Sequence, residues 1–136
     1  MTITEQKAAQ RKAGIAARRA LSDTERTHSN AALCARIMAL DCFKKAENIL
    51  LYAAFGGEAD LSTLAVEAAR QGKMLAYPVC GEGFSLTAAV PGPDGWEVGT
   101  YGIRTPILSR SAVLPPDKLD LVLVPCTAFD LSLIHI

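Results

Sequence analysis

The sequence is poor in the residues from which zinc sites and disulfide frameworks are built. Its 136 residues include only four cysteines and two histidines. The cysteines stand at positions 34, 42, 80 and 126, so none forms the Cys-x-x-Cys pair of a zinc site. We therefore assign no metal-binding side chain from the sequence, and we expect reduced thiols in the core of a cytoplasmic protein.

Net charge and long apolar runs are also lacking. The 14 Lys and Arg residues equal the 14 Asp and Glu residues in number, so no overall field favours nucleic acid or an anionic membrane. No apolar run approaches the ~20 residues of a membrane span, and the N-terminus has no apolar signal core. We expect a soluble cytoplasmic monomer that binds neither nucleic acid nor membranes.

What the sequence contains is the composition of one globular domain. Hydrophobic residues make up 50% and charged residues 21%, which excludes a disordered chain. Good helix formers fill residues 3–20. Ser22 and Glu25 then have the spacing of a capping box, which predicts a second helix over residues 23–40.

A strand, a helix and a strand follow. Residues 49–54 form a short apolar run, typical of a strand that is buried on both faces. Apolar residues then recur at helical spacing over residues 61–69, with Asp60 as a candidate N-cap and Gly72 as a candidate C-cap. Residues 74–79 form a second apolar strand, so we expect two parallel strands joined by a right-handed crossover.

The whole pattern predicts a three-layer α/β/α fold with a mainly parallel sheet. We expect a hairpin turn at residues 81–83, a third strand over residues 84–90 and a further strand over residues 120–125. Between them, residues 91–106 predict an irregular excursion with Trp96, Val98 and Ile103 as its anchors.

Glu58 is the first candidate for a functional side chain. In open parallel sheets, ligands bind beyond the carboxyl ends of the strands, and Glu58 follows the first strand on a loop with Gly56 and Gly57. The alternative is a structural one, because glycines serve turns and acidic residues suit helix N-termini.

The first helix offers a second candidate, a basic stripe. Lys7, Arg11 and Arg18 are spaced four and seven residues apart and share one helix face, on which Gly14 also lies. Two cations one turn apart can hold a polyphosphate. The alternative is a solvated basic face.

Other side chains give weaker indications. His28 is a lone histidine on a helix, and we expect a surface or core position for it. Cys126 stands where a nucleophile could lie, but only His135 is available as a partner. Tyr52 and Tyr77 either line the crevice or are buried tyrosines with satisfied hydroxyl groups.

Taken together, five stretches in order resemble the 5-formyltetrahydrofolate cyclo-ligase family, also called methenyltetrahydrofolate synthetases. The resemblance spans residues 7–130. Its elements are Lys7 and Arg11 in a Lys-x-x-x-Arg pattern, the strand and loop of residues 51–60, the Gly-Lys, strand and Pro of residues 72–78, the Gly-Ile stretch of residues 101–106, and the Asp, Pro and Phe-Asp of residues 120–130.

This resemblance implies an enzyme that uses ATP and Mg²⁺ to convert 5-formyltetrahydrofolate to 5,10-methenyltetrahydrofolate, with ADP and phosphate as the other products. The formyl oxygen would attack the γ-phosphate, N10 would then attack the activated carbon, and phosphate would leave. Lys7 and Arg11 would hold the phosphates of ATP. Ala53 would line the folate site, and Glu58 would contact and orient the reacting end of the folate.

The resemblance also implies that part of the fold is missing. The family continues after its Phe-Asp into a glycine-rich loop that supplies phosphate and metal contacts. We therefore expect residues 1–130 to be the N-terminal part of one domain that is incomplete at its C-terminus, and residues 131–136 to be a non-native tail. We expect the 136-residue chain itself to be inactive or nearly so.

Two other functions remain open. One is a non-catalytic α/β module that binds a nucleotide or a pterin in the same crevice. The other is a relative of sugar-phosphate isomerases or CoA-transferases that shares only the layered architecture, with Glu58 as its base.

Overall fold

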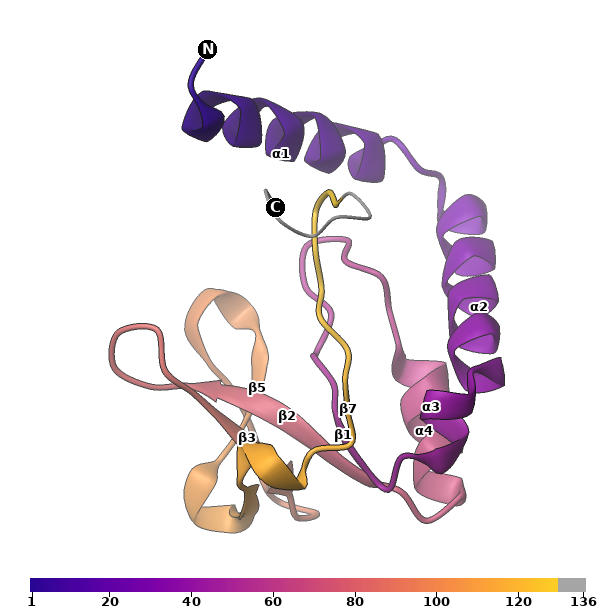
Figure 1. Ribbon diagram of the computed structural model, residues 1–136, viewed down its shortest axis with the longest axis vertical. Helices are drawn as coiled ribbons and strands as arrows, with labels where there is room; N and C mark the ends of the chain where they lie inside the picture. Colours follow the sequence, from indigo (N-terminus) through magenta and orange to yellow (C-terminus); the bar gives the residue numbers. More distant parts are fainter. Residues whose placement is uncertain (130–136) are drawn as a thin grey trace.

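The computed structural model describes residues 1–129 as an α/β domain with one long helix set across its top (Figure 1). The predicted tail at residues 131–136 lies outside the described residues. The helices are α1 (Ile3–Arg19), α2 (Asp23–Ala39), α3 (Asp41–Lys45) and α4 (Ser62–Arg70). The strands are β1 (Asn48–Leu50), β2 (Met74–Cys80), β3 (Leu86–Pro91), β4 (Trp96–Val98), β5 (Arg104–Pro106), β6 (Ser111–Leu114) and β7 (Leu121–Val122).

Both long helices begin at a capping box. The predicted box at Ser22 and Glu25 is confirmed: the Glu25 N–H donates to the Ser22 hydroxyl, and the Ser22 N–H donates to the Glu25 carboxylate. Thr2 and Glu5 form an equivalent box at the start of α1, which the sequence analysis did not identify. These local contacts fix the first residue of each helix.

The central sheet has the strand order β6-β3-β2-β1-β7. β1 pairs in parallel with both β2 and β7, whereas β3 is antiparallel to both of its neighbours, β2 and β6. Four of the five strands therefore run in one direction, and β3 alone is reversed. The predicted α/β class with a mainly parallel sheet is confirmed.

The hydrophobic core lies between β1 and the helices α2, α3 and α4. Ile49 and Leu51, two residues apart on one side of the extended chain, are fully buried against Phe43 and Leu64. Only one cysteine, Cys34, belongs to this cluster; the other three are free and exposed. The expectation that the cysteines are core thiols is therefore wrong for Cys42, Cys80 and Cys126.

Asp120 fastens the last strand to the first. Its Oδ2 accepts hydrogen bonds from the N–H groups of Glu47 and Asn48, both at 2.9 Å, and the Asn48 side-chain amide donates to the Lys118 carbonyl at 2.9 Å. These bonds lower the pKa of the Asp120 carboxyl group. They set the register in which Ile49 pairs with Leu121.

The structure corrects two of the predicted boundaries and one predicted anchor. The strands expected at residues 49–54 and 120–125 keep ladder pairing only over Asn48–Leu50 and Leu121–Val122. One further bond continues each pairing, from the Leu51 N–H to the Ala76 carbonyl and from the Leu123 N–H to the Leu50 carbonyl. Residues 91–106 are not irregular throughout, because β4 and β5 form an antiparallel hairpin. Val98 is 71% exposed and does not anchor this hairpin.

Trp96 is the side chain that anchors the hairpin. Its ring meets Tyr77 of β2 edge to face, with 4.7 Å between the ring centroids. The Arg104 guanidinium lies over the Trp96 ring, 4.5 Å from the ring centroid. None of the helices within residues 1–129 combines the length and the apolar character that crossing a membrane would require.

Candidate functional site

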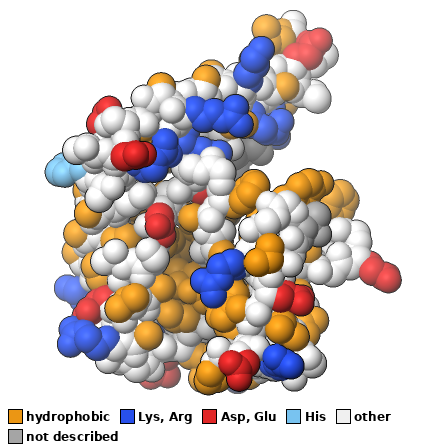
Figure 2. All heavy atoms as spheres, turned by 180° about the vertical axis from the view of Figure 1, so that it is seen from behind, with side chains coloured by type: hydrophobic (Ala, Val, Ile, Leu, Met, Phe, Trp, Pro, Cys, Tyr) orange, Lys and Arg blue, Asp and Glu red, His pale blue; other side chains and the backbone are white. Residues whose placement is uncertain are grey.

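Helix α1 lies across the carboxyl ends of β1 and β7 (Figure 1). Lys7, Gln10 and Arg11 line a cavity of about 240 Å³ together with residues 125–128, which follow β7. Figure 2 shows basic side chains gathered along the top of the molecule, where α1 lies. The structure therefore brings the predicted pair, Lys7 and Arg11, to the edge of the sheet where ligands of such folds bind.

Gly14 explains how α1 comes so close to this edge. A Cβ atom at Gly14 would lie 2.8 Å from the Thr127 carbonyl oxygen and 3.0 Å from its Cγ2. Glycine is unfavourable within a helix by roughly 1 kcal/mol relative to alanine. Its presence here permits the close approach of the helix backbone to the chain after β7.

Arg18 continues the stripe to the loop after β1. A Cβ atom at Gly57 would lie 3.0 Å from Arg26 Nη1 and 3.5 Å from Arg18 Nε. Gly57 also has φ +81°, a conformation that favours glycine. Within the stripe, Lys7 and Arg18 are half-buried and Arg11 is exposed.

Glu58 is held by its own loop. Its Oε2 accepts a hydrogen bond of 3.1 Å from the Phe55 N–H, and its own N–H donates to the Phe55 carbonyl at 3.2 Å. The Tyr52 hydroxyl donates to the Ala59 carbonyl at 2.8 Å and closes the other side of the loop. Burial raises the pKa of Tyr52, and the charge of Glu58 raises it further.

Glu58 borders a mainly apolar cavity of about 370 Å³ on the α2 side of the loop. Its other walls come from α2, from the loop after β1 and from the chain after β7. Phe129, which is 67% exposed, and Val124, which is 72% exposed, form its outer rim. A carboxylate at the border of an apolar cavity can orient a polar ligand atom while the rest of the ligand loses contact with water.

Ala53 lines a different cavity, of about 220 Å³, which shares Tyr52 as a wall with the cavity beside Glu58. The walls of this cavity include Asp60, Tyr77, Trp96 and Arg104. Burial raises the pKa of Tyr77, and nearby Arg104 lowers it by a smaller amount. Two aromatic rings, a carboxylate and a guanidinium provide the groups that a flat, polar heterocycle requires.

The predicted substrate residues are therefore neighbours but do not share a cavity. Ala53 and Glu58 line separate cavities, and Tyr52 and Leu61 form part of the wall of both. The sequence pattern assigns Arg104 to no site and predicts Trp96 only as an anchor. Pairing of β4 with β5 brings these two side chains together, and a local pattern in the sequence does not encode that register.

The remaining candidates gain little from the structure. His28 is exposed on α2. Cys126 is exposed and lines both the cavity beside Lys7 and the cavity beside Glu58, and its expected partner His135 lies outside the described residues. Asp60 is not the N-cap residue itself; it precedes the cap, Leu61, and accepts a hydrogen bond of 2.9 Å from the Ser62 N–H.

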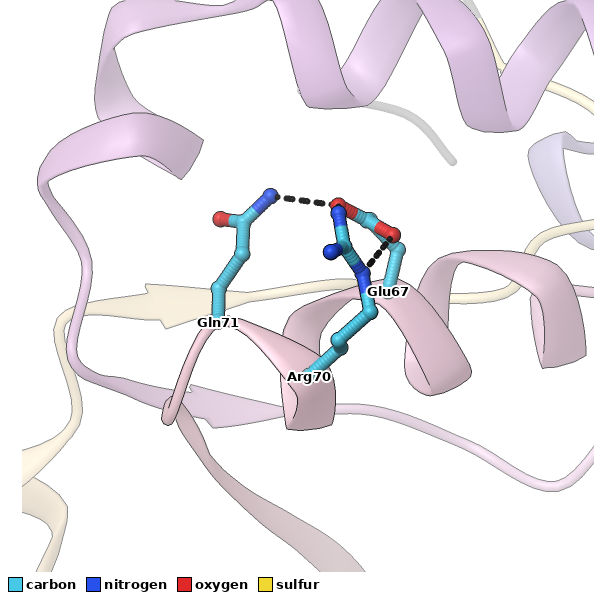
Figure 3. Close-up of polar contacts among 3 residues, drawn as sticks. All are labelled: Glu67, Arg70 and Gln71. Atoms are coloured by element: carbon cyan, nitrogen blue, oxygen red, sulfur yellow. Dashed lines mark hydrogen bonds and ion pairs between the residues drawn. The ribbon is translucent and has the colours of Figure 1, made fainter.

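A charged network on α4 lies apart from these cavities. Glu67 accepts hydrogen bonds from Arg70 Nε and Nη2 at 2.9 and 2.6 Å and from Gln71 Nε2 at 3.0 Å (Figure 3). The bonds from Arg70, followed by that from Gln71, lower the pKa of Glu67 to about 2. All three side chains belong to the helix and its end, so the network stabilises α4 locally.

Comparisons with known proteins identify a family and two structures of similar fold. The model of the 5-formyltetrahydrofolate cyclo-ligase family matches residues 3–132. The solved structure of 5,10-methenyltetrahydrofolate synthetase from Aquifex aeolicus is 32% identical, with a TM-score of 0.78 over 92% of this chain. No curated protein sequence matches the chain closely enough to count as a relative.

A second solved structure has the same fold at lower identity. The 5,10-methenyltetrahydrofolate synthetase from Mycoplasma pneumoniae is 17% identical, with a TM-score of 0.67 over 88% of this chain. The chain spans 63% of the length of each of these two structures.

Proposed function

Because the chain belongs to the 5-formyltetrahydrofolate cyclo-ligase family, we propose that it serves the ATP-dependent conversion of 5-formyltetrahydrofolate to 5,10-methenyltetrahydrofolate. The observation that carries this proposal is the position of α1. Its basic pair, Lys7 and Arg11, lies over one cavity at the sheet edge, and two further cavities border the adjacent loop. An enzyme with two substrates needs such adjacent sites, one for the phosphates and one for the folate.

The proposed reaction proceeds in two steps. The formyl oxygen attacks the γ-phosphorus of ATP, the bond to the bridging oxygen breaks, and ADP leaves. N10 of the folate then attacks the activated carbon, and phosphate leaves with the former formyl oxygen as N10 loses its proton. An amide oxygen is a poor leaving group, so the phosphorylation drives ring closure. Positioning and charge neutralisation carry most of the catalysis.

Lys7 and Arg11 hold the phosphates of ATP in this proposal. Arg11 offers a planar fork that suits phosphate oxygens, and Lys7 adds a compact charge one helical turn away. The adjoining residues 125–128 form the opposite wall of the cavity. A polyphosphate bound between α1 and the chain after β7 would therefore contact both cations.

In this proposal the folate occupies the two cavities that share Tyr52 as a wall. The pterin ring lies in the cavity lined by Ala53, where Trp96 and Tyr77 supply aromatic surface. Glu58 contacts the reacting end, orients it and receives or releases the N10 proton. The loop bond from the Phe55 N–H holds this carboxylate in place.

No side chain of the described part of the chain is assigned as a ligand of Mg²⁺. Within residues 1–129 no group of three or more His, Cys, Asp or Glu residues could hold a metal ion. Mg²⁺ commonly binds through substrate phosphates and water, with only one or two carboxylates. We therefore derive no step that passes through the metal, and its use with ATP stays a prediction, as do the cytoplasmic location and the monomer.

The proposal is tested by mixing the chain with 5-formyltetrahydrofolate, ATP and Mg²⁺ and following 5,10-methenyltetrahydrofolate together with ADP. The assay is run on the 136-residue chain and on a chain extended to the length of its structural relatives. ATP-dependent product from the extended chain supports the proposal, and we predict little product from the 136-residue chain. Binding without turnover in both would favour a non-catalytic module, and turnover of a sugar phosphate without ATP would favour an isomerase-like relative.

A further inference from the structure

The position of α1 is not set by a hydrophobic core. No residue of α1 is buried, although the helix carries the cations that the proposed reaction needs. A helix that presents its charges so far from the core requires other contacts to hold its direction. The junction between α1 and α2, at residues 20–22, is therefore the place to look for them.

Arg26 spans this junction. Its Nη2 donates to the carbonyl oxygens of Arg18 and Leu21, at 3.2 and 3.3 Å. Arg18 lies in the last turn of α1, so the guanidinium satisfies a carbonyl at the helix end and places positive charge at its negative pole. Arg26 stands near the N-terminus of α2, where the positive end of the helix dipole disfavours a cation. Its contact with the C-terminal end of α1 offsets this unfavourable interaction.

The same guanidinium also reaches the loop that carries Glu58. Its Nη1 lies 3.0 Å from the position that a Cβ atom of Gly57 would occupy, next to the Arg18 side chain. The buried Nε of Arg18, which lies beside Gly57, has no hydrogen-bond partner. An unsatisfied buried donor is destabilising, so other contacts at this place must offset its cost. Arg26 thus touches the end of α1, the start of α2 and the loop after β1.

We infer that Arg26 is a positioning residue, which sets the angle between α1 and α2 and so holds Lys7 and Arg11 over residues 125–128. It does not touch the nucleotide itself. The contact of Gly14 with Thr127 is the second point at which α1 meets the sheet edge. One contact at the junction and one near the middle of the helix together determine where the basic pair lies.

The function of the basic pair rests on the proposed reaction, but the position of α1 can be measured without it. Gln10 of α1 and Cys126 line the same cavity. We suggest Gln10→Cys in a background with Cys42→Ser and Cys80→Ser, which leaves Cys126 as the only exposed native thiol within residues 1–129. A short bifunctional maleimide then links positions 10 and 126 when α1 lies over the sheet edge, and intact mass gives the rate.

Arg26→Ala is expected to slow this crosslink severalfold, while Arg26→Lys, which keeps a donor near the two carbonyls, restores most of the rate. Arg36→Ala is the matched control, because it removes an exposed arginine from the same helix. Circular dichroism checks that each variant is folded. If Arg26→Ala does not fold, Arg26→Met removes the donors and keeps more of the side-chain volume.

Ligand affinities give a second readout. Arg26→Ala should weaken ATP binding about tenfold and leave the affinity for 5-formyltetrahydrofolate nearly unchanged, because small misplacements of binding groups are costly. A folded Arg26→Ala chain that crosslinks at the rate of the unmodified chain would overturn the inference. Absence of ATP binding in every variant of the extended chain would instead count against the proposed function, and the crosslink would still decide the role of Arg26.

Discussion

Gly14 of α1 lies so close to Thr127 that any larger residue would bring its Cβ atom to 2.8 Å from the Thr127 carbonyl oxygen. The contact joins the first helix to the chain that follows the last described strand. It brings the basic stripe of α1 within reach of the sheet edge. Gly14 therefore lowers the stability of α1 but allows the helix to approach the site.

Gly14→Ala tests this relationship. The substitution favours the isolated helix by about 1 kcal/mol, but a forced contact with a backbone oxygen typically costs about 1–3 kcal/mol. We expect a lower thermal midpoint, or an unchanged midpoint with weaker ATP binding if α1 moves away instead. Ala17→Gly, at an exposed position of the same helix, measures the effect of helix propensity alone. A Gly14→Ala chain that is more stable and binds ATP normally would refute the close contact.

Lys7→Ala and Arg11→Ala should each weaken ATP binding by about 10- to 100-fold. Hydrogen bonds to charged groups contribute about 1.5–3 kcal/mol each, which corresponds to that range. The affinity for 5-formyltetrahydrofolate should change little, since neither residue lines the cavities next to Tyr52. Lys12→Ala, which removes an exposed cation outside the cavity of Lys7, is the control. Calorimetric titration with unchanged ATP affinity in both variants would favour the solvated basic face.

Glu58→Gln separates the charge of this side chain from its structural bond. Glutamine retains an oxygen that can accept from the Phe55 N–H, so the loop should keep its shape. We expect turnover in an extended chain to fall by about 100-fold or more, the range associated with general acid–base groups, or folate affinity to fall, with ATP binding intact. Glu58→Ala should in addition loosen the loop. Full turnover by Glu58→Gln would assign this carboxylate a purely structural role.

Asp120 predicts a pH dependence of stability. The N–H groups of Asn48 and Glu47 lower its pKa in the folded chain, so its contribution is fully present above its unfolded pKa, about 3.9. That contribution is lost as the pH falls through the lower folded pKa. Asp120→Asn should reduce the urea midpoint at neutral pH, and the difference from the unmodified chain should shrink at about pH 2. Asp117→Asn, an exposed carboxylate nearby, is the control. A difference that grows toward low pH would contradict the assignment.

Trp96 provides a spectroscopic test of the folate cavity. It is the only tryptophan in the sequence, so its fluorescence reports on one place. We expect 5-formyltetrahydrofolate to quench this fluorescence in a saturable manner and ATP alone to leave it nearly unchanged. Arg104→Ala should weaken the folate effect severalfold, because a cation over an indole contributes about 0.5–2 kcal/mol. Quenching by ATP but not by folate would move the pterin to another cavity.

The parts of the fold that depend on neighbours in the chain could be predicted from the sequence. Ser22 and Glu25 form their capping box because the partners are three residues apart, and the helix they open follows as predicted. The glycine at position 72 has the positive φ expected after a helix. Residues 81–83, which follow β2, form the predicted hairpin turn, since the Gly81 N–H donates to the Ser85 carbonyl.

The parts that depend on distant partners could not. Nothing near Gly14 in the sequence indicates that Thr127 faces it, and the sequence alone shows only a glycine that opposes its helix. Trp96 and Arg104 meet through the register of a hairpin. The strands were predicted too long because apolar residues continue past the last ladder residues, Leu50 and Val122, and a local apolar pattern does not show where pairing ends. The spacing of Lys7 and Arg11 predicts that they form a pair. The cavity that they line could not be predicted, because its other wall is formed by residues 125–128, far away in the sequence.

The place of β1 in the sheet has a consequence for the order in which the chain acquires its structure. Among the described strands β1 comes first in the chain, yet it lies between β2 and β7. A nascent chain can pair β1 with β2 once residue 76 has emerged, but the other edge of β1 stays open until residues 121–122 arrive. That delay leaves a parallel strand edge unpaired during synthesis, and such edges are prone to non-native pairing with other chains. The rate of synthesis therefore sets the interval during which this edge of β1 is exposed.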